Sequence, residues 1–256
     1  MNVVLGTVPY LNALPLHATL DHQPGIEIVQ AIPAVLAPML ARGECEVALI
    51  PIVEHLRGVG EHMISNAGVG SQGPVESVVM FHRAPVETLT SIAVDASSRS
   101  SVALLRVLLH DGYGVTPQFV EHAPDLESML RHHEATLMIG DPALQAAQRV
   151  PPGVLVFDLA TEWKQLTGLP FIFAGWVTKR GLSEQRRDEL TALLNQARDE
   201  AKRDVAGLVR ATHLSPGVTV DVKEHYLTHA IIHHLTDPFY AGLAEFRRRA
   251  QNLGVI

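Results

Sequence analysis

The sequence predicts an α/β fold built as two lobes, and three observations lead to this prediction. Short apolar runs alternate with amphipathic segments over residues 3–158, in the strand–helix–strand order that parallel sheets require. This order occurs in two successive units, each too short to be a complete doubly wound domain. From residue 183 onward the chain is instead predicted to be helical, and terminal helices of this kind usually pack back across a lobe.

The expected elements are short and follow one another closely. The first unit is expected to hold strands at 3–8, 26–32, 47–52, 64–71 and 77–81 and helices at 11–20, 34–42 and 53–57. The second unit is expected to hold strands at 92–95, 118–121, 137–140 and 154–158 and helices at 100–110, 126–132 and 143–148. Helices are expected last, at 183–211, 222–235 and 238–252. If they cover the first unit, the first lobe comprises residues 1–84 and 176–256, and the second lobe comprises residues 85–175.

Composition narrows the classes of function. The formal charge of −7 disfavours a nucleic-acid surface, which needs a basic face. Cys45 is the single cysteine, so no intramolecular disulfide forms, which suits a reducing compartment. No apolar run approaches the length of a membrane span, and residues 2–8 are predicted to be a strand rather than a leader. We therefore expect a cytoplasmic protein.

Three candidate ligand groups lie where open α/β sheets bind ligands, at the carboxyl ends of strands. Asn12 follows the first strand and offers two donors and an acceptor, although it could equally cap the next helix. Ser77 begins a strand that faces the expected cleft, and its alternative role is a backbone hydrogen bond. Asp141, in the loop Gly140-Asp141-Pro142, could bind a substrate hydroxyl or cap the helix at Pro142.

The serine-rich junction, residues 95–101, connects a predicted strand to a predicted helix and favours an anion site. Hydroxyl groups and free backbone N–H groups at a helix N-terminus attract anions, and the helix dipole adds to this. The hydroxyls belong to Ser98, Ser100 and Ser101. Arg99 could complete a bidentate carboxylate clamp. The alternatives are simple helix capping by Ser98 or Ser100 and pairing of Arg99 with a structural carboxylate.

Histidines do not indicate a metal site. His225, His229 and His233 recur at i, i+4 and i+8 on one predicted helix face, but no Glu completes a zinc-binding H-E-x-x-H pattern. A solvated polar stripe is favoured. The sequence also lacks a P-loop, a dinucleotide-binding fingerprint, a nucleophile elbow and a Cys-x-x-Cys pair, so we expect no metal and no cofactor.

Three segments carry a resemblance to a known family. They are residues 6–16 (GTVPYLNALPL), 95–105 (DASSRSSVALL) and 137–144 (LMIGDPAL), the last followed by Trp163 and residues 168–174 (GLPFIFA). Together they resemble the chorismate dehydratase family of the futalosine route to menaquinone, and length and order agree over essentially the whole chain. Ser100 departs from the pattern, because threonine is expected there at least as often, without altering the chemistry. The resemblance implies a two-lobed periplasmic-binding-protein-like (type II) fold with a ligand cleft between the lobes.

The resemblance also implies a reaction: cofactor-independent loss of water across C3 and C4 of chorismate, giving 3-[(1-carboxyvinyl)oxy]benzoate. Asn12 and Ser77 are the implied catalytic residues, near the leaving hydroxyl and the enolpyruvyl group. The implied substrate-binding residues are Tyr10, Ser98, Arg99, Ser100, Ser101, Gly140 and Asp141. Chorismate is the expected partner, without nucleic acid or membrane, and a homodimer is compatible with the sequence. No protein base is evident in these motifs, so a substrate carboxylate is a candidate for taking the C3 proton.

Other functions use the same fold. One alternative is a non-catalytic solute-binding protein for a small carboxylate, which the missing leader disfavours. Another is 1,4-dihydroxy-6-naphthoate synthase of the same pathway, whose start differs from the segment at residues 9–16. A metal-dependent hydrolase built on the histidine stripe is the most distant alternative.

Overall fold

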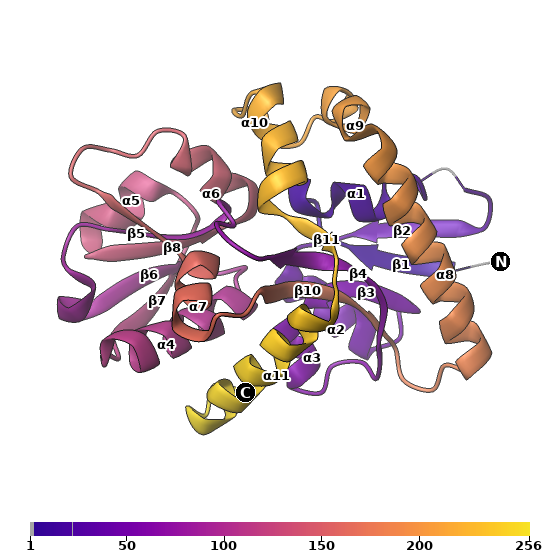
Figure 1. Cartoon of the computed structure of the whole chain (residues 1–256), viewed down its shortest axis with the longest axis horizontal. Helices are drawn as coiled ribbons and strands as arrows, with labels where there is room; N and C mark the ends of the chain where they lie inside the picture. The colour runs from indigo at the N-terminus through magenta and orange to yellow at the C-terminus, as the bar shows by residue number, and fades with distance from the viewer. Residues whose placement is uncertain (1–2, 22) are drawn as a thin grey trace.

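The computed structural model describes residues 3–21 and 23–256, which form two β-sheets side by side (Figure 1). The first sheet consists of β1 (Val3–Thr7), β2 (Ile26–Gln30), β3 (Val47–Pro51), β4 (Met63–Ser71), β10 (Phe171–Thr178) and β11 (Ile232–His234), in the order β11-β4-β10-β3-β1-β2. The second consists of β5 (Val78–His82), β6 (Ser91–Asp95), β7 (Gln118–His122), β8 (Ala135–Ile139) and β9 (Leu155–Asp158), in the order β7-β6-β8-β5-β9. Each sheet is the centre of one lobe.

Helices cover both sheets. In the first half of the chain they are η1 (Leu11–Ala13), α1 (Leu14–His17), α2 (Pro33–Ala41), α3 (Ile52–Leu56), η2 (Val86–Thr88), α4 (Ser100–Tyr113) and α5 (Leu126–His132). In the second half they are α6 (Gly140–Ala147), α7 (Leu159–Thr167), α8 (Glu184–Ala201), η3 (Lys202–Asp204), α9 (Val205–Ala211), α10 (Val220–His225), the π-helical turn η4 (Tyr226–Ala230) and α11 (Asp237–Asn252). Within the described ranges, no helix is both long enough and apolar enough to span a bilayer.

The predicted strand–helix–strand order at the start of the chain is confirmed. β1 pairs in parallel with β2 on one side and with β3 on the other. All five residues of β3 are buried, as expected for a strand covered on both faces. α2 begins with Pro33 at its first position, where a missing N–H costs nothing. In the second unit β6 pairs in parallel with β7 and β8, also as predicted.

The sheets divide the chain differently from the expected boundaries. β5 was expected in the first lobe, but it pairs with β8 and β9 in the second sheet. β10 begins at Phe171, within the expected second lobe, yet it lies between β3 and β4 in the first sheet. We therefore propose that the chain passes between the lobes near residues 75 and 170, rather than at 84 and 175.

The expected helix at 222–235 is confirmed as far as Ala230 and wrong beyond it. α10 ends at His225, the π-helical turn follows, and β11 then joins the edge of the first sheet beside β4. Burial alternates from Ile231 to Leu235, because the strand turns every second side chain inward. The helix at 183–211 is interrupted by η3, and α7 and β10 were not predicted.

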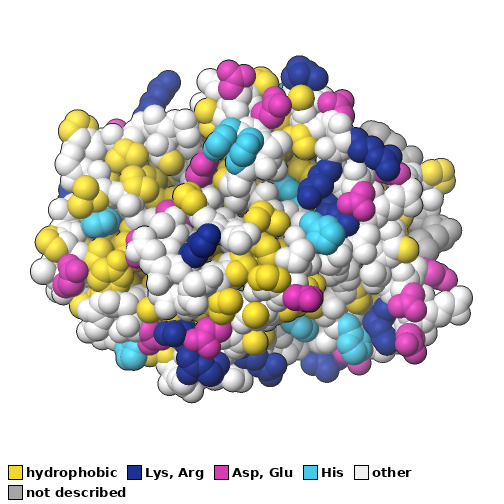
Figure 2. Space-filling model, in the orientation of Figure 1, with side chains coloured by type: hydrophobic (Ala, Val, Ile, Leu, Met, Phe, Trp, Pro, Cys, Tyr) yellow, Lys and Arg dark blue, Asp and Glu magenta, His cyan; other side chains and the backbone are white. Residues whose placement is uncertain are grey.

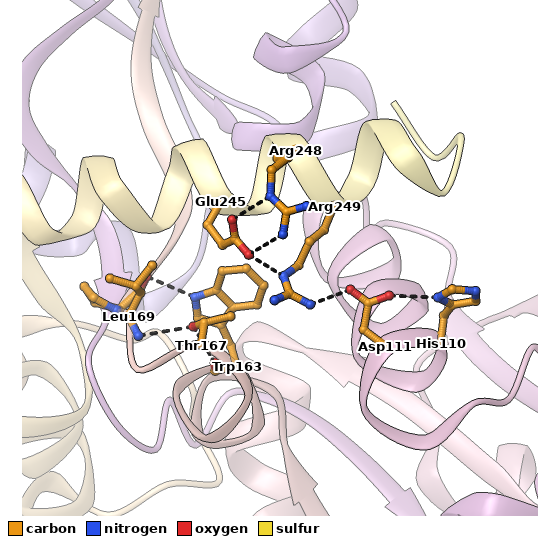
Figure 3. A network of polar contacts seen from close by, with 9 residues as sticks. His110, Asp111, Trp163, Thr167, Leu169, Glu245, Arg248 and Arg249 are labelled. Atoms are coloured by element: carbon orange, nitrogen blue, oxygen red, sulfur yellow. Dashed lines mark hydrogen bonds and ion pairs between the residues drawn. The ribbon is translucent and has the colours of Figure 1, made fainter.

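α11 lies across the junction of the two lobes (Figure 1). Its Phe246 packs edge-to-face against Trp163 of α7 and Phe171 of β10. Figure 3 shows Arg249 of α11 joined both to Glu245 and to Asp111 of α4, with Nη1 2.6 Å from the Asp111 carboxylate. The last long helix thus holds elements of both lobes.

Gly242 allows this close approach, and its replacement tests it. A Cβ atom at Gly242 would lie 2.1 Å from the carbonyl oxygen of Pro170, which is backbone and cannot rotate away. We expect Gly242→Ala to lower the free energy of unfolding by about 1–3 kcal/mol, measured by urea denaturation. Gly112→Ala is the matched control, because that helical glycine has nothing within 4 Å of its Cβ position. The control should be neutral or stabilising by up to about 1 kcal/mol. Equal stability of both variants would contradict the packing described.

Candidate functional site

A cavity lies between the lobes, where the turn after β1 faces the start of α4. Its wall is largely apolar and includes Val8, Leu49 and Phe173 from the first lobe and Val78 and Ile139 from the second. The polar lining residues are Tyr10, Asn12, Ser97, Arg99, Ser100 and Ser101. The Asn12 turn and the serine-rich junction, predicted separately from sequence, thus share one cavity.

The turn after β1 is held in place by the second lobe. The backbone N–H of Leu11 donates to Oδ1 of Asp141 at 2.9 Å. Asp141 itself does not line the cavity. The alternative role of Asp141 as a cap of α6 is wrong, because α6 has no side-chain cap, and the carboxylate instead caps a 3-10 turn on the opposite lobe. Burial raises the pKa of Asp141, which the Leu11 hydrogen bond partly offsets.

Gly140 is needed for the approach of Tyr10. Its φ of +62° is a conformation that glycine adopts readily, and a Cβ there would lie 3.3 Å from the Tyr10 ring. The Tyr10 hydroxyl lies 3.5 Å from Oγ of Ser97 across the cavity. Burial raises the pKa of Tyr10, so its phenol is protonated at neutral pH.

The start of α4 has the features of an anion site. Arg99 occupies the N-cap position without a side-chain cap bond, so neither Ser98 nor Ser100 acts as the expected cap. The first-turn N–H groups of a helix have no intrahelical acceptor, and the helix dipole makes this end positive. Arg99 lines the cavity, and its nearest carboxylate is Glu121, at 3.9 Å. A ligand carboxylate in the cavity would therefore meet both N–H donors and a guanidinium.

Ser100 has a different role from the expected one. Its hydroxyl donates to the Phe173 carbonyl at 3.1 Å and accepts from the Val53 N–H at 3.2 Å. Both partners are backbone groups of the first lobe, so this hydroxyl joins the lobes and is already occupied. The Ser97 hydroxyl also has a protein partner, because it donates to the Asp95 carboxylate at 2.7 Å.

Besides Asp141, two predicted site residues do not reach the cavity wall. Ser77 is fully buried, and its Oγ lies 2.6 Å from the Tyr226 hydroxyl. Within the described part of the chain its hydroxyl makes no backbone hydrogen bond; instead, the backbone carbonyl of Ser77 accepts the Gly140 N–H at 2.8 Å. Ser98 is also buried, and its Oγ has no hydrogen-bond partner among the described residues.

Sequence reasoning missed two residues behind Asn12. His233 is 1% exposed, and its Nε2 lies 2.8 Å from the Asn12 carbonyl oxygen. The expected polar stripe holds for His225 and His229, which are exposed and stacked at 4.8 Å, but it is wrong for His233. Alternating apolar residues around His233 were the available signal for a strand. Tyr226, whose hydroxyl meets Ser77, is the second missed residue.

The chemistry of the cavity is that of binding rather than of proton abstraction by protein. Of the described residues in its wall, Tyr10 and Arg99 alone have ionisable side chains. Over residues 3–21 and 23–256, no three His, Cys, Asp or Glu side chains gather as a metal site would require. Figure 2 shows Lys and Arg spread among acidic side chains on the visible face, without one basic patch.

Comparisons with known proteins identify the family. A family model described as "Menaquinone biosynthesis" matches residues 3–252, so the chain belongs to that family. A relative named chorismate dehydratase from Thermus thermophilus is 32% identical, over 98% of this chain and 95% of its own. Another chorismate dehydratase, from Campylobacter jejuni, is 29% identical over 72% of this chain and 71% of its own.

Solved structures show the same fold. Protein AF1704 from Archaeoglobus fulgidus matches with a TM-score of 0.82 and 18% identity, over 100% of this chain and 98% of its own. The periplasmic aliphatic sulphonate-binding protein SsuA from Escherichia coli matches with a TM-score of 0.69 and 18% identity, over 98% of this chain and 86% of its own. The predicted periplasmic-binding-protein-like fold is confirmed.

The buried histidine gives a pH test of this site. The pKa of His233 is lowered to about 4, mainly by burial and also by the charges of Lys202 and Arg198, while the hydrogen bond to the Asn12 carbonyl opposes the shift. Between about pH 6.5 and about pH 4 the unfolded chain therefore binds more protons at this position than the folded chain. As the pH is lowered through this window, we expect the free energy of unfolding to fall by up to about 3 kcal/mol more in the wild type than in the His233→Gln variant. Urea denaturation at several pH values measures the difference, and parallel pH dependences of the two proteins would contradict it.

Proposed function

We propose that this protein dehydrates chorismate to 3-[(1-carboxyvinyl)oxy]benzoate without a cofactor. The observation that supports the proposal is the shared cavity, which is lined both by the Asn12 turn and by the start of α4. Relatives named chorismate dehydratase, at 32% and 29% identity, support the same assignment. Chorismate has two carboxylates and an apolar ring face. The cavity wall offers Arg99 for a carboxylate and apolar side chains for the ring.

Binding of the substrate follows from the wall. We assign one carboxylate to Arg99 and the first-turn N–H groups of α4, because a guanidinium and a helix N-terminus both stabilise an anion. Apolar residues such as Leu49, Val78 and Phe173 would enclose the ring. The Ser100 hydroxyl would act indirectly, by keeping the lobes together around the guest.

The reaction breaks the C3–H and C4–O bonds and forms a C3–C4 double bond, so the ring becomes aromatic. The C3 proton needs an acceptor, yet Tyr10 has a raised pKa and Arg99 is a cation. We therefore assign the proton to a carboxylate of chorismate itself, and the carboxylic acid so formed returns it to the departing C4 hydroxyl, which leaves as water. The enzyme would hold that carboxylate near C3, which turns proton transfer into an intramolecular step.

Asn12 is the proposed partner of the leaving hydroxyl. It lines the cavity, and its Oδ1 is buried without a hydrogen-bond partner among the described residues. A buried acceptor without a donor is unfavourable, and the C4 hydroxyl of the substrate would satisfy it by donating its own proton, which orients this hydroxyl in the cavity. The closed lobes would also exclude bulk water from the breaking C4–O bond. Ser77 would act on this group only through Tyr226.

The direct test incubates the purified protein with chorismate. The expected product is aromatic and lighter than chorismate by one water, followed by ultraviolet absorbance and mass spectrometry. Binding of chorismate without conversion would instead favour a solute receptor. A cytoplasmic location, suited to a chain with a single cysteine, and a homodimer stay predictions.

Asn12→Ala removes the proposed partner of the leaving hydroxyl. We expect kcat to fall by about 10²–10³-fold, because the leaving hydroxyl loses the group that orients it for departure, with KM within about threefold of the wild type. Steady-state rates from product absorbance measure both constants. A variant with unchanged kcat would remove Asn12 from the mechanism.

Arg99 should act mainly in binding. We expect Arg99→Ala to raise KM by about 30–100-fold, since a charge-assisted pair to a carboxylate is lost, and Arg99→Lys to lie between the two proteins. Arg106→Ala is the matched control: Arg106 lies two turns further along α4 and stacks on Phe119 at 4.2 Å, outside the cavity. Equal KM changes in the Arg99→Ala and Arg106→Ala variants would refute a specific role for Arg99.

A further inference from the structure

Asn12 is held from behind by residues that do not line the cavity. The first is His233 of β11, whose Nε2 lies 2.8 Å from the Asn12 carbonyl oxygen. The second is Tyr226 in the π-helical turn, whose phenol has the Asn12 side chain as a hydrogen-bond partner. Both come from the segment that joins α10 to α11, more than 200 positions from Asn12 in the chain.

The Tyr226 phenol connects two polar side chains. Tyr226 is 1% exposed, its Oη lies 2.6 Å from Oγ of Ser77, and it also meets the Asn12 amide. Because Oδ1 of Asn12 is unpartnered, we infer that the amide N–H is the group that faces the phenol. Burial raises the pKa of Tyr226, so the phenol keeps its proton and can donate to Ser77 while it accepts from Asn12.

His233 fixes the backbone of the same residue. A carbonyl oxygen only accepts, so Nε2 must carry the proton in this contact. The imidazole is neutral at physiological pH because burial lowers its pKa. The backbone carbonyl of Asn12 therefore contacts His233, and its side-chain amide faces Tyr226. In this orientation Oδ1 of Asn12 has no protein partner among the described residues.

The local backbone is shaped to deliver these two groups. A π-helical turn is rare and is often found at functional sites. Here it spans Tyr226 to Ala230 and ends directly before β11, so Tyr226 and His233 reach the Asn12 turn from adjacent elements.

We propose that Tyr226 and His233 are positioning residues, which act on the reaction by orienting the Asn12 amide toward the leaving hydroxyl of the substrate. This inference rests on the proposed function. It predicts that their loss lowers kcat through Asn12 and leaves substrate binding largely intact, which a merely stabilising role would not do.

Tyr226→Phe removes the hydroxyl and keeps the ring. We expect kcat to fall by about 10–100-fold, with KM within about threefold. Tyr240→Phe is the matched control, because it also removes a phenol hydroxyl. In the wild type that hydroxyl makes only a long hydrogen bond, 3.4 Å, to the Ser65 carbonyl. Rates are normalised to the number of chorismate sites found by calorimetry, so that a misfolded fraction does not count as lost turnover.

A double-mutant cycle tests whether Tyr226 acts through Asn12. In an Asn12→Ala background, Tyr226→Phe should lower the single-turnover rate by less than about threefold, because the group to be oriented is already absent. The same 10–100-fold loss in both backgrounds would show that Tyr226 acts independently, and would overturn the proposal.

His233 offers a rescue test. His233→Gln retains an N–H donor and should keep kcat within about fivefold, whereas His233→Leu should lose about tenfold or more. His234→Gln, at the neighbouring exposed position, is the control. Equal kcat in the Gln and Leu variants of His233 would overturn its role. A wild type that does not convert chorismate would overturn the proposed function and this inference together, whereas an active wild type with a fully active Tyr226→Phe variant overturns this inference alone.

Discussion

The cavity depends on one contact, the docking of the start of α4 against the first lobe. Ser100 is buried, and its single hydroxyl bonds both to the Val53 N–H and to the Phe173 carbonyl. Loss of that hydroxyl would leave two backbone groups of the first lobe unpaired in an apolar interface, which is costly. The bond from Leu11 to Asp141 closes the opposite wall. These contacts bring the positive end of α4 to the Asn12 turn.

The two chain crossings and α11 limit how the lobes can move relative to each other. The chain crosses between the sheets twice, and α11 lies across both lobes, with Arg249 bound to Asp111 of α4. Gly242 lets this helix approach the Pro170 carbonyl at the second crossing. Opening of the cavity must therefore bend the two crossings while α11 stays packed or shifts with them.

Local patterns predicted most of the fold between residues 3 and 158. Strands such as β3 and β6 and helices such as α4 were found because apolar periodicity and helix-stop residues act over a few positions. β10 was missed, although its residues are almost all apolar, because it follows a helix that the sequence pattern did not mark. The lobe boundary was misplaced for a related reason: strand periodicity does not say which sheet a strand joins.

The sequence by itself determined the chemistry available at the site: an amide after the first strand, serines and an arginine at a helix start, and a family resemblance that spans the chain. Only the tertiary structure decided how these groups are used. It turned the Ser100 hydroxyl toward the other lobe, moved Ser77 and Asp141 behind the wall, and brought His233 to Asn12. The physical reason is that hydrogen bonds between distant segments depend on packing in space, which residue type and spacing do not encode.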